Sequence, residues 1–458
     1  PPAQVTVRPL DAPQAGAVGL AGPERTGLAP DLWGAGRAED IARRLAAMPE
    51  RPLPAARDAL MTLITARLAA PAGAPPAQEA LLLARIDAAL RLGALEEAAG
   101  LIDAAGTGGP ELFRRAFDIA LLRGTEDAGC AELAAAPGIA PSIAVRIFCL
   151  ARSGDWPAAA LTLETAEALG QLEPLEDALL ARFLDAELAE GVPPLPRFPA
   201  PTPLEWRMLE AIGERQPTAG LPLAYAHADL RGTAGWKTRI EATERLVRAG
   251  ALPAGRLIDA YTERTPSASG GVWARAAAVQ ALVAALDASR ARPAAQALQT
   301  AWAEMCAAGL AVAFAEAMAP RLANRDLGPD GARLAHRIAL LAPGYERAAL
   351  APPEGADPLP LALAKGLPPP RQEPPDPLQR AVAAAFAAPA PPLPDRLTRL
   401  RAADRRGEAL LEALAIVAAG RQADPADLTG ALAYLRTEGM EAVARRAALQ
   451  IVLLEGAT

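Results

Sequence analysis

The sequence predicts an all-α protein, and three features of its composition point to that class. Alanine and leucine dominate a chain of 458 residues in which 52% are hydrophobic but only 4% are aromatic. This mixture favours helix, whereas β-branched and aromatic residues are too sparse for a β protein. The 46 prolines cannot lie inside so many helices, so they must separate short ones. We therefore expect about 60% helix or more, joined by Pro- and Gly-rich corners.

Hydrophobic residues recur at helical spacing along most of the chain, starting near residue 37. Ile41, Leu45 and Met48 fall on one face of the first helix, and Pro49 ends it. The same spacing predicts further helices at 55–68, 77–92, 95–105, 174–190, 204–214, 236–248, 254–261, 272–289, 293–308, 311–318, 378–388, 395–401, 407–419, 424–436 and 438–454.

Two proline-rich runs and the length of the chain suggest several structural units. The length is about three times that of a typical domain, which favours two or three units. Proline runs make semi-rigid spacers, so we place boundaries at them. The predicted organisation is an extended N-terminal tail (1–30), a helical-repeat unit (31–190), a linker (191–203), a middle helical unit (204–350), a second linker (351–377) and a C-terminal helical unit (378–458).

A short motif recurs in the first helical unit with a period of about 30 residues. Its glycines are Gly93, Gly124 and Gly154, and each is preceded and followed by a predicted helix. Glycine ends one helix in the left-handed conformation, and the acidic residues that follow favour the start of the next helix. The pattern predicts an array of helix–turn–helix pairs.

These motifs resemble the tetratricopeptide-like α-solenoid superfamily. The resemblance rests on Leu92-Gly93 followed by Glu97-Ala98, and on Ser153-Gly154-Asp155-Trp156; it covers residues 77–170. It implies an α-solenoid of antiparallel helix hairpins with Pro-rich extended linkers. It also implies binding of other proteins rather than catalysis, because such folds present long surfaces without an enclosed pocket.

Two of the three cysteines are candidates for a disulfide. Cys130 and Cys149 lie in neighbouring predicted helices separated by prolines, and antiparallel helices bring such residues within bonding reach. A structural disulfide would indicate an oxidising compartment. The alternative is two buried small hydrophobic residues. Cys306 has no evident partner and is expected to be a core thiol.

The sequence contains no recognisable catalytic or cofactor motif. A P-loop, a Gly-x-Ser-x-Gly elbow and Cys-x-x-Cys spacing are all missing, and the two histidines, His227 and His336, are far apart. Ser267 and Ser269 near His227 could form a hydrolytic pair, but a capping role before the next helix is the stronger reading. We therefore predict no enzyme activity, no cofactor and no metal site.

Net charge and hydropathy exclude two further classes. The charge of −7 argues against a nucleic-acid-binding protein, which would carry a basic face. No apolar stretch is long enough to predict an integral membrane span. The predicted partners are proteins of a larger assembly, and self-association is a second option.

Aromatic residues gather in the predicted middle unit. Tyr225, Trp236, Tyr261 and Trp273 are our candidates for partner binding, because Trp and Tyr are favoured anchors at interfaces. The competing interpretation is that they fill the core of an alanine-rich bundle.

The chain starts at Pro1, as a chain would after removal of a secretory signal, although trimming would leave the same start. The sequence thus favours an exported, non-catalytic helical-repeat scaffold in the periplasm. Its place would be a bacterial envelope assembly, such as an accessory component of the flagellar motor. The alternatives are the helical domain of a cell-wall-acting enzyme and a cytoplasmic regulatory adaptor.

Overall fold

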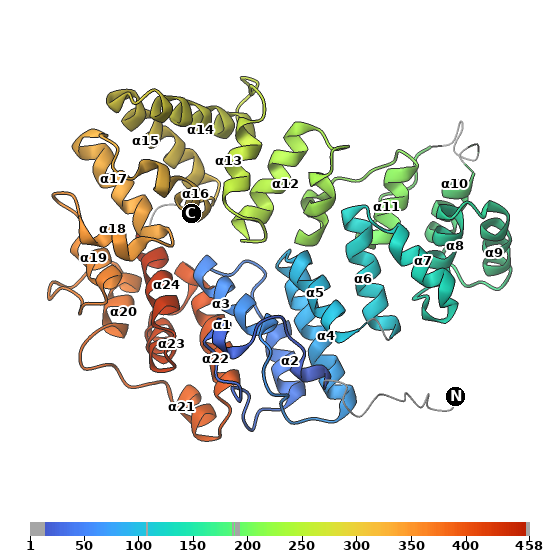
Figure 1. Ribbon diagram of the computed structural model, residues 1–458, viewed down its shortest axis with the longest axis horizontal. Helices are drawn as coiled ribbons and strands as arrows, with labels where there is room; N and C mark the ends of the chain where they lie inside the picture. The colour runs from blue at the N-terminus through green and yellow to red at the C-terminus, as the bar shows by residue number, and fades with distance from the viewer. Residues whose placement is uncertain (1–13, 107–108, 186, 188–192, 455–458) are drawn as a thin grey trace. The chain divides into compact units, whose positions relative to one another are not determined.

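The computed structural model describes residues 14–106, 109–185, 187 and 193–454, and these form an all-α protein (Figure 1). Helices account for 67% of it. In the described part of the chain, β pairing is confined to two isolated bridges, between Ala21 and Ala66 and between Arg37 and Ala72. The predicted fold class and helix content are confirmed.

Contacts divide the chain into two compact units. Unit 1 comprises residues 1–94 and 236–458, and unit 2 comprises residues 95–235, so unit 2 is inserted in the sequence of unit 1. The helices of unit 1 are η1 (Ala15–Ala17), α1 (Pro23–Thr26), α2 (Ala38–Ala46), α3 (Pro54–Thr65), α4 (Pro75–Arg91), α12 (Trp236–Arg248), α13 (Gly255–Thr262), α14 (Val272–Asp287), α15 (Ala291–Ala307), α16 (Ala311–Leu322), α17 (Gly328–Leu341), α18 (Tyr345–Leu350), α19 (Pro358–Lys365), α20 (Pro377–Ala385), α21 (Asp395–Ala402), α22 (Arg406–Ala418), η6 (Gly420–Gln422), α23 (Pro425–Thr437) and α24 (Glu441–Leu453). Those of unit 2 are α5 (Leu95–Ala105), α6 (Pro110–Arg123), α7 (Asp127–Ala135), η2 (Pro137–Ile139), α8 (Ile143–Arg152), α9 (Trp156–Ala168), α10 (Pro174–Leu184), α11 (Pro203–Ala211), η4 (Thr218–Gly220) and η5 (Leu223–Leu230).

Prolines separate the helices by opening them. Pro54, Pro110 and Pro425 each stand at the first position of a helix, as do the prolines of many other helices of both units. Proline fits there because its missing N–H would have no partner in the first turn and its fixed φ suits the helix. Pro320 in α16 is an exception, since it lies inside a helix.

The second proline-rich run, 351–377, is not an extended linker. It contains α19, which Asp357 caps by accepting a hydrogen bond of 3.0 Å from the backbone N–H of Leu359. Leu359 and Leu363 are buried. Our prediction treated proline as a helix breaker here, whereas Pro358 stands at the first position of the helix and is compatible with it.

The first run and the predicted tail also pack against the units to which they belong. Phe198, in the run 191–203, is buried in the core of unit 2, so this run does not separate two units. Of the predicted tail, residues 1–13 lie outside the described residues, while 14–30 contain η1 and α1 and bury Val18 and Leu28. The predicted helix 174–190 is seen as α10, which ends at Leu184.

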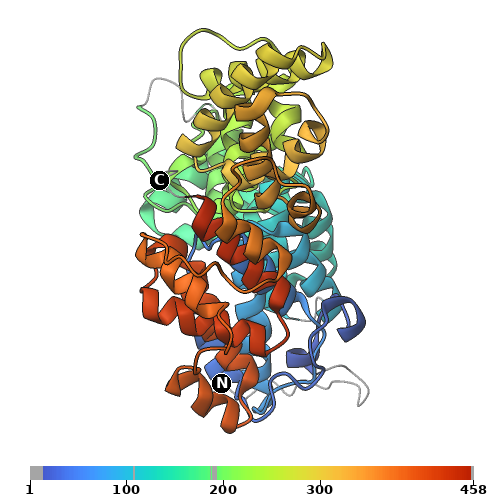
Figure 2. The same cartoon turned by 90° about the vertical axis from the view of Figure 1, so that its left-hand side faces the viewer.

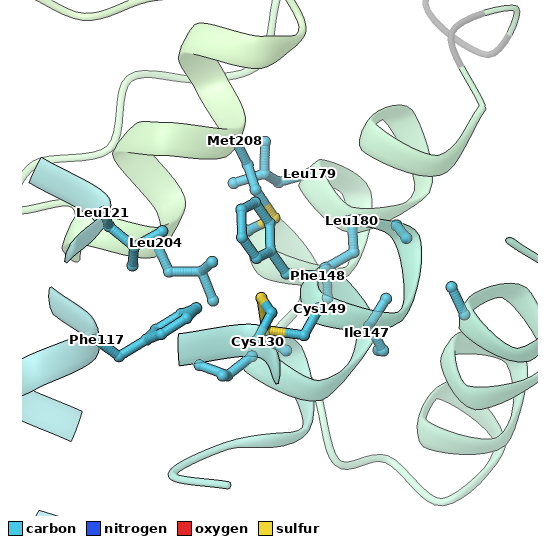
Figure 3. Close-up of a cluster of buried hydrophobic side chains, with 14 of the residues drawn as sticks. Phe117, Leu121, Cys130, Ile147, Phe148, Cys149, Leu179, Leu180, Leu204 and Met208 are labelled. Carbon is cyan, nitrogen blue, oxygen red and sulfur yellow. A yellow bond between two sulfur atoms is a disulfide. The ribbon is translucent and has the colours of Figure 1, made fainter. Parts of the chain in front are cut away.

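Unit 2 contains the turns that define the sequence repeat. Gly124 and Gly154 follow α6 and α8 with φ of 75° and 86°, the left-handed conformation that glycine adopts without strain. The helices enclose one apolar cluster, in which Phe117, Phe148 and Met208 come from α6, α8 and α11 (Figure 3). This core fixes the α7–α8 hairpin at its edge.

Unit 1 joins the first helices of the chain to the last. α3 packs against α22 and α24, and Figures 1 and 2 show these blue and red helices side by side. Arg44 in α2 is paired with the buried Glu408 at 3.1 Å, and Gln450 accepts a hydrogen bond of 3.0 Å from the backbone of Ala55. In a solenoid each repeat contacts only its neighbours in sequence. The packing within unit 1 departs from that rule.

Candidate functional site

A disulfide joins α7 to α8 in unit 2. The sulfur atoms of Cys130 and Cys149 are 2.03 Å apart, and the Cα atoms are 5.0 Å apart, within the usual range for a disulfide. Figure 3 shows the bond at the edge of the apolar cluster. The predicted pairing is confirmed. Cys306, in unit 1, is a free, partly buried thiol, and burial raises its pKa.

The largest cavity of unit 2 is an open groove between these two helices. It has a volume of about 650 Å³, and we call it the α7–α8 groove. Its walls are the apolar side chains of Leu133, Ala134 and Leu150 together with the disulfide. Ala134 is exposed and Leu133 is buried, so the groove opens to solvent over an apolar floor. Such a floor suits apolar side chains of another polypeptide.

Arginines form the polar rim of the groove. Arg152 donates to Asp127 at 2.5 Å, and this hydrogen bond is the main reason that the pKa of Arg152 is raised. Arg146 donates to the backbone carbonyl of Pro137 at 3.1 Å, and none of the described carboxylates pairs with it. The charged side chains of the lining therefore carry a net positive charge.

An ion pair fixes the start of α7 to another part of unit 2. Glu126, which is 1% exposed, accepts a hydrogen bond of 3.0 Å from Arg207 in α11. Beside it, the ring of Trp206 lies between the guanidinium groups of Arg215 and Arg231, at 5.3 and 5.6 Å from the ring centre. Because Glu126 would be costly to bury unpaired, this contact holds α7 in place beneath the groove.

The next helix, α9, presents apolar side chains to solvent. Leu161 and Leu169 are each 65% exposed, and Trp156 is 49% exposed. The face that α9 buries against α8 and α10 carries Ala159, Leu163 and Ala166 instead. Exposed single leucines are common, but two on the same outer face of one helix form an apolar surface beside the groove.

The aromatic residues that we selected from sequence do not form one surface. Tyr225, in unit 2, is 6% exposed and its hydroxyl donates to the carbonyl of Pro201 at 2.5 Å. Tyr261, in unit 1, is 0% exposed and donates to Glu244 at 2.7 Å. Both tyrosines fill cores, so burial keeps them from any partner.

The two selected tryptophans lie together in unit 1 and are partly buried. The rings of Trp236 and Trp273 are 4.8 Å apart, and the indole N–H of Trp236 donates to the carbonyl of Ala260 at 2.9 Å. This contact ties the start of α12 to α13 and α14. The pair thus supports packing within unit 1, which was our alternative interpretation.

The residues considered for chemistry stay apart from any reactive arrangement. The hydroxyls of Ser267 and Ser269 are bonded to each other at 2.8 Å in an exposed loop. His336 borders a smaller cavity of about 210 Å³ in unit 1, and burial lowers its pKa. Across the described ranges, no three His, Cys, Asp or Glu side chains are grouped so as to hold a metal ion. The described helices include none with the length and apolar character needed to cross a membrane.

Sequence reasoning found the disulfide but missed the groove and its support. The pairing of Glu126 with Arg207 joins residues 81 positions apart, and no local pattern in the sequence indicates it. The exposed leucines of α9 could be found from sequence only once the buried face of the helix is known.

A scan against models of known protein families and searches among curated proteins and solved structures found no match for the chain. The resemblance to the tetratricopeptide-like superfamily stays a prediction.

Proposed function

We propose that the protein is a non-catalytic helical scaffold that binds other polypeptides through the α7–α8 groove and the adjoining outer face of α9. The observation that carries this proposal is the groove, which has an apolar floor, a volume of about 650 Å³ and a rim with net positive charge. A groove between two packed helices accommodates the ridge of side chains of a third helix.

The disulfide also supports an oxidising compartment for this scaffold. Structural disulfides persist in the bacterial periplasm and in secreted proteins, and they are rare in the cytoplasm. We therefore propose a periplasmic location and a role in an envelope assembly, for which an accessory position in the flagellar motor is one concrete setting.

The test blocks the groove without disturbing the core. Ala134 lines the groove and is exposed, so Ala134→Trp fills it from the surface. Ala135 is exposed on the same helix but does not line the groove, so Ala135→Trp is the matched control. We expect the first variant to lose the partners that the native chain captures from an envelope extract, and the control to keep them.

Both variants should have the circular dichroism spectrum of the native protein. If Ala134→Trp recovers the same partners with unchanged affinity, the groove is not the binding surface and the proposal fails.

A further inference from the structure

We infer that the groove receives α9 of a second copy of this chain, so that the protein forms a dimer through its α7–α9 region. This inference rests on the proposed function, because it names the occupant of the same groove. The outer face of α9 and the α7–α8 groove are present in every copy, and their chemistry is complementary.

The apolar parts of the two surfaces correspond. Leu161 and Leu169 are eight residues apart, which places them on the same side of α9 about two turns from each other. Both are 65% exposed. α9 is a helix of 13 residues, about 20 Å long, whereas α7 and α8 contain nine and ten residues. A helix of this length spans the groove, and its two leucines can enter the apolar floor.

The charges of the two surfaces are opposite. Glu164 and Glu167 lie on α9, and Asp177 on α10 is close to Glu167. None of the described arginines or lysines forms an ion pair with these three carboxylates. A hydrogen bond with Asp177 and the repulsion of the like charges raise the pKa of Glu167. The acidic patch therefore lacks a cation within its own chain.

The groove supplies that cation. Arg146 is exposed at the rim and has only a backbone carbonyl as partner among the described residues. Placing α9 of a second copy in the groove brings carboxylates of one chain to the arginine of the other. The same operation buries four leucines in a reciprocal pair, and a reciprocal contact closes as a two-fold dimer.

Charge reversal tests the inference on the purified chain alone. We expect light scattering after size exclusion to give about twice the monomer mass of 47.2 kDa. Arg146→Glu and the pair Glu164→Arg with Glu167→Arg should each weaken self-association by about tenfold or more, since like charges then meet at both contacts.

Mixing the two charge-reversed chains is the decisive arm. In the mixed dimer both contacts again join opposite charges, so association should return. No other partner is present, so only contact between α9 and the groove explains such a rescue.

An apolar arm complements the charges. Leu161→Asp combined with Leu169→Asp should abolish the dimer, whereas Leu350→Asp, at a leucine that is 77% exposed in unit 1, should leave it intact. The inference is overturned if the native chain is monomeric at about 100 µM, a concentration that populates even weak dimers. It is also overturned if the α9 variant dimerises normally.

A monomeric native chain whose partners are still lost with Ala134→Trp would overturn the dimer and leave the proposed function standing. Loss of the proposed function would instead appear as partner capture that is insensitive to Ala134→Trp.

Discussion

Replacing Arg85 by methionine should destabilise unit 1 by about 3 kcal/mol, because this buried arginine holds three backbone carbonyls. Arg85 is 3% exposed, and its guanidinium donates to the carbonyls of Ile64, Val18 and Ala66 at 2.7, 2.5 and 2.8 Å. Two of these carbonyls belong to the end of α3, where helix carbonyls lack partners and a cation is favourable. The third belongs to the segment that precedes α1.

The magnitude follows from two opposing contributions. Three hydrogen bonds from a charged donor, at about 2 kcal/mol each, stabilise the fold by roughly 6 kcal/mol. Burial lowers the pKa of Arg85 to about 10, and the corresponding cost of the buried charge is roughly 3 kcal/mol. Methionine removes both contributions and fills similar space, so a net loss of about 3 kcal/mol remains.

Guanidinium titration followed by circular dichroism measures the change in the free energy of unfolding. Arg67→Met is the matched control, because Arg67 is exposed beside the same carbonyls and should change stability by less than about 0.5 kcal/mol. Arg85→Lys should not rescue stability, because an ammonium lacks the planar fork that reaches three acceptors. A loss below about 1 kcal/mol in Arg85→Met would refute the reasoning.

Three further predictions concern the disulfide, the tryptophan pair and one histidine. Reducing the bond between Cys130 and Cys149, which are 19 residues apart, should lower the stability of unit 2 by about 3 kcal/mol; coincident denaturation curves with and without reductant would contradict this. Trp273→Ala should cost about 2 kcal/mol, since its ring packs on Trp236; a melting temperature equal to the native value would favour a surface role instead. Because burial lowers the pKa of His336, the unfolded chain binds its proton more readily, so stability should fall as the pH drops below about 6.5. Between pH 7 and pH 5 the urea midpoint of His336→Gln should fall less than that of the native protein, and equal falls would count against the assignment.

Local features of the fold were predictable from sequence because they depend on neighbouring residues. The predicted helix 236–248 coincides with α12, and Gly124 ends α6 as the repeat indicated. The disulfide was also accessible, because Cys130 and Cys149 belong to adjacent helices whose connection is short.

Features that depend on distant residues were not predictable in the same way. The closure of unit 1 pairs Arg44 with Glu408, and the spacing of hydrophobic residues does not say which helix meets which. The burial of Tyr225 and Tyr261 shows the same gap, since an aromatic ring with a polar tip suits a core as well as an interface. The composition of the run 351–377 was misleading because proline both ends helices and begins them.

The packing of α3 against α22 and α24 has a consequence for synthesis of the protein. Leu60, Leu63 and Ile64 are buried in the finished fold, yet the helices that α3 packs against emerge from the ribosome more than three hundred residues later. During that interval the apolar face of α3 has no native cover, whereas unit 2 has all its residues once the chain reaches Gly235. The inserted unit can therefore fold first, and the beginning of the nascent chain must be kept from aggregating, by chaperones or by transient contacts, until its end arrives.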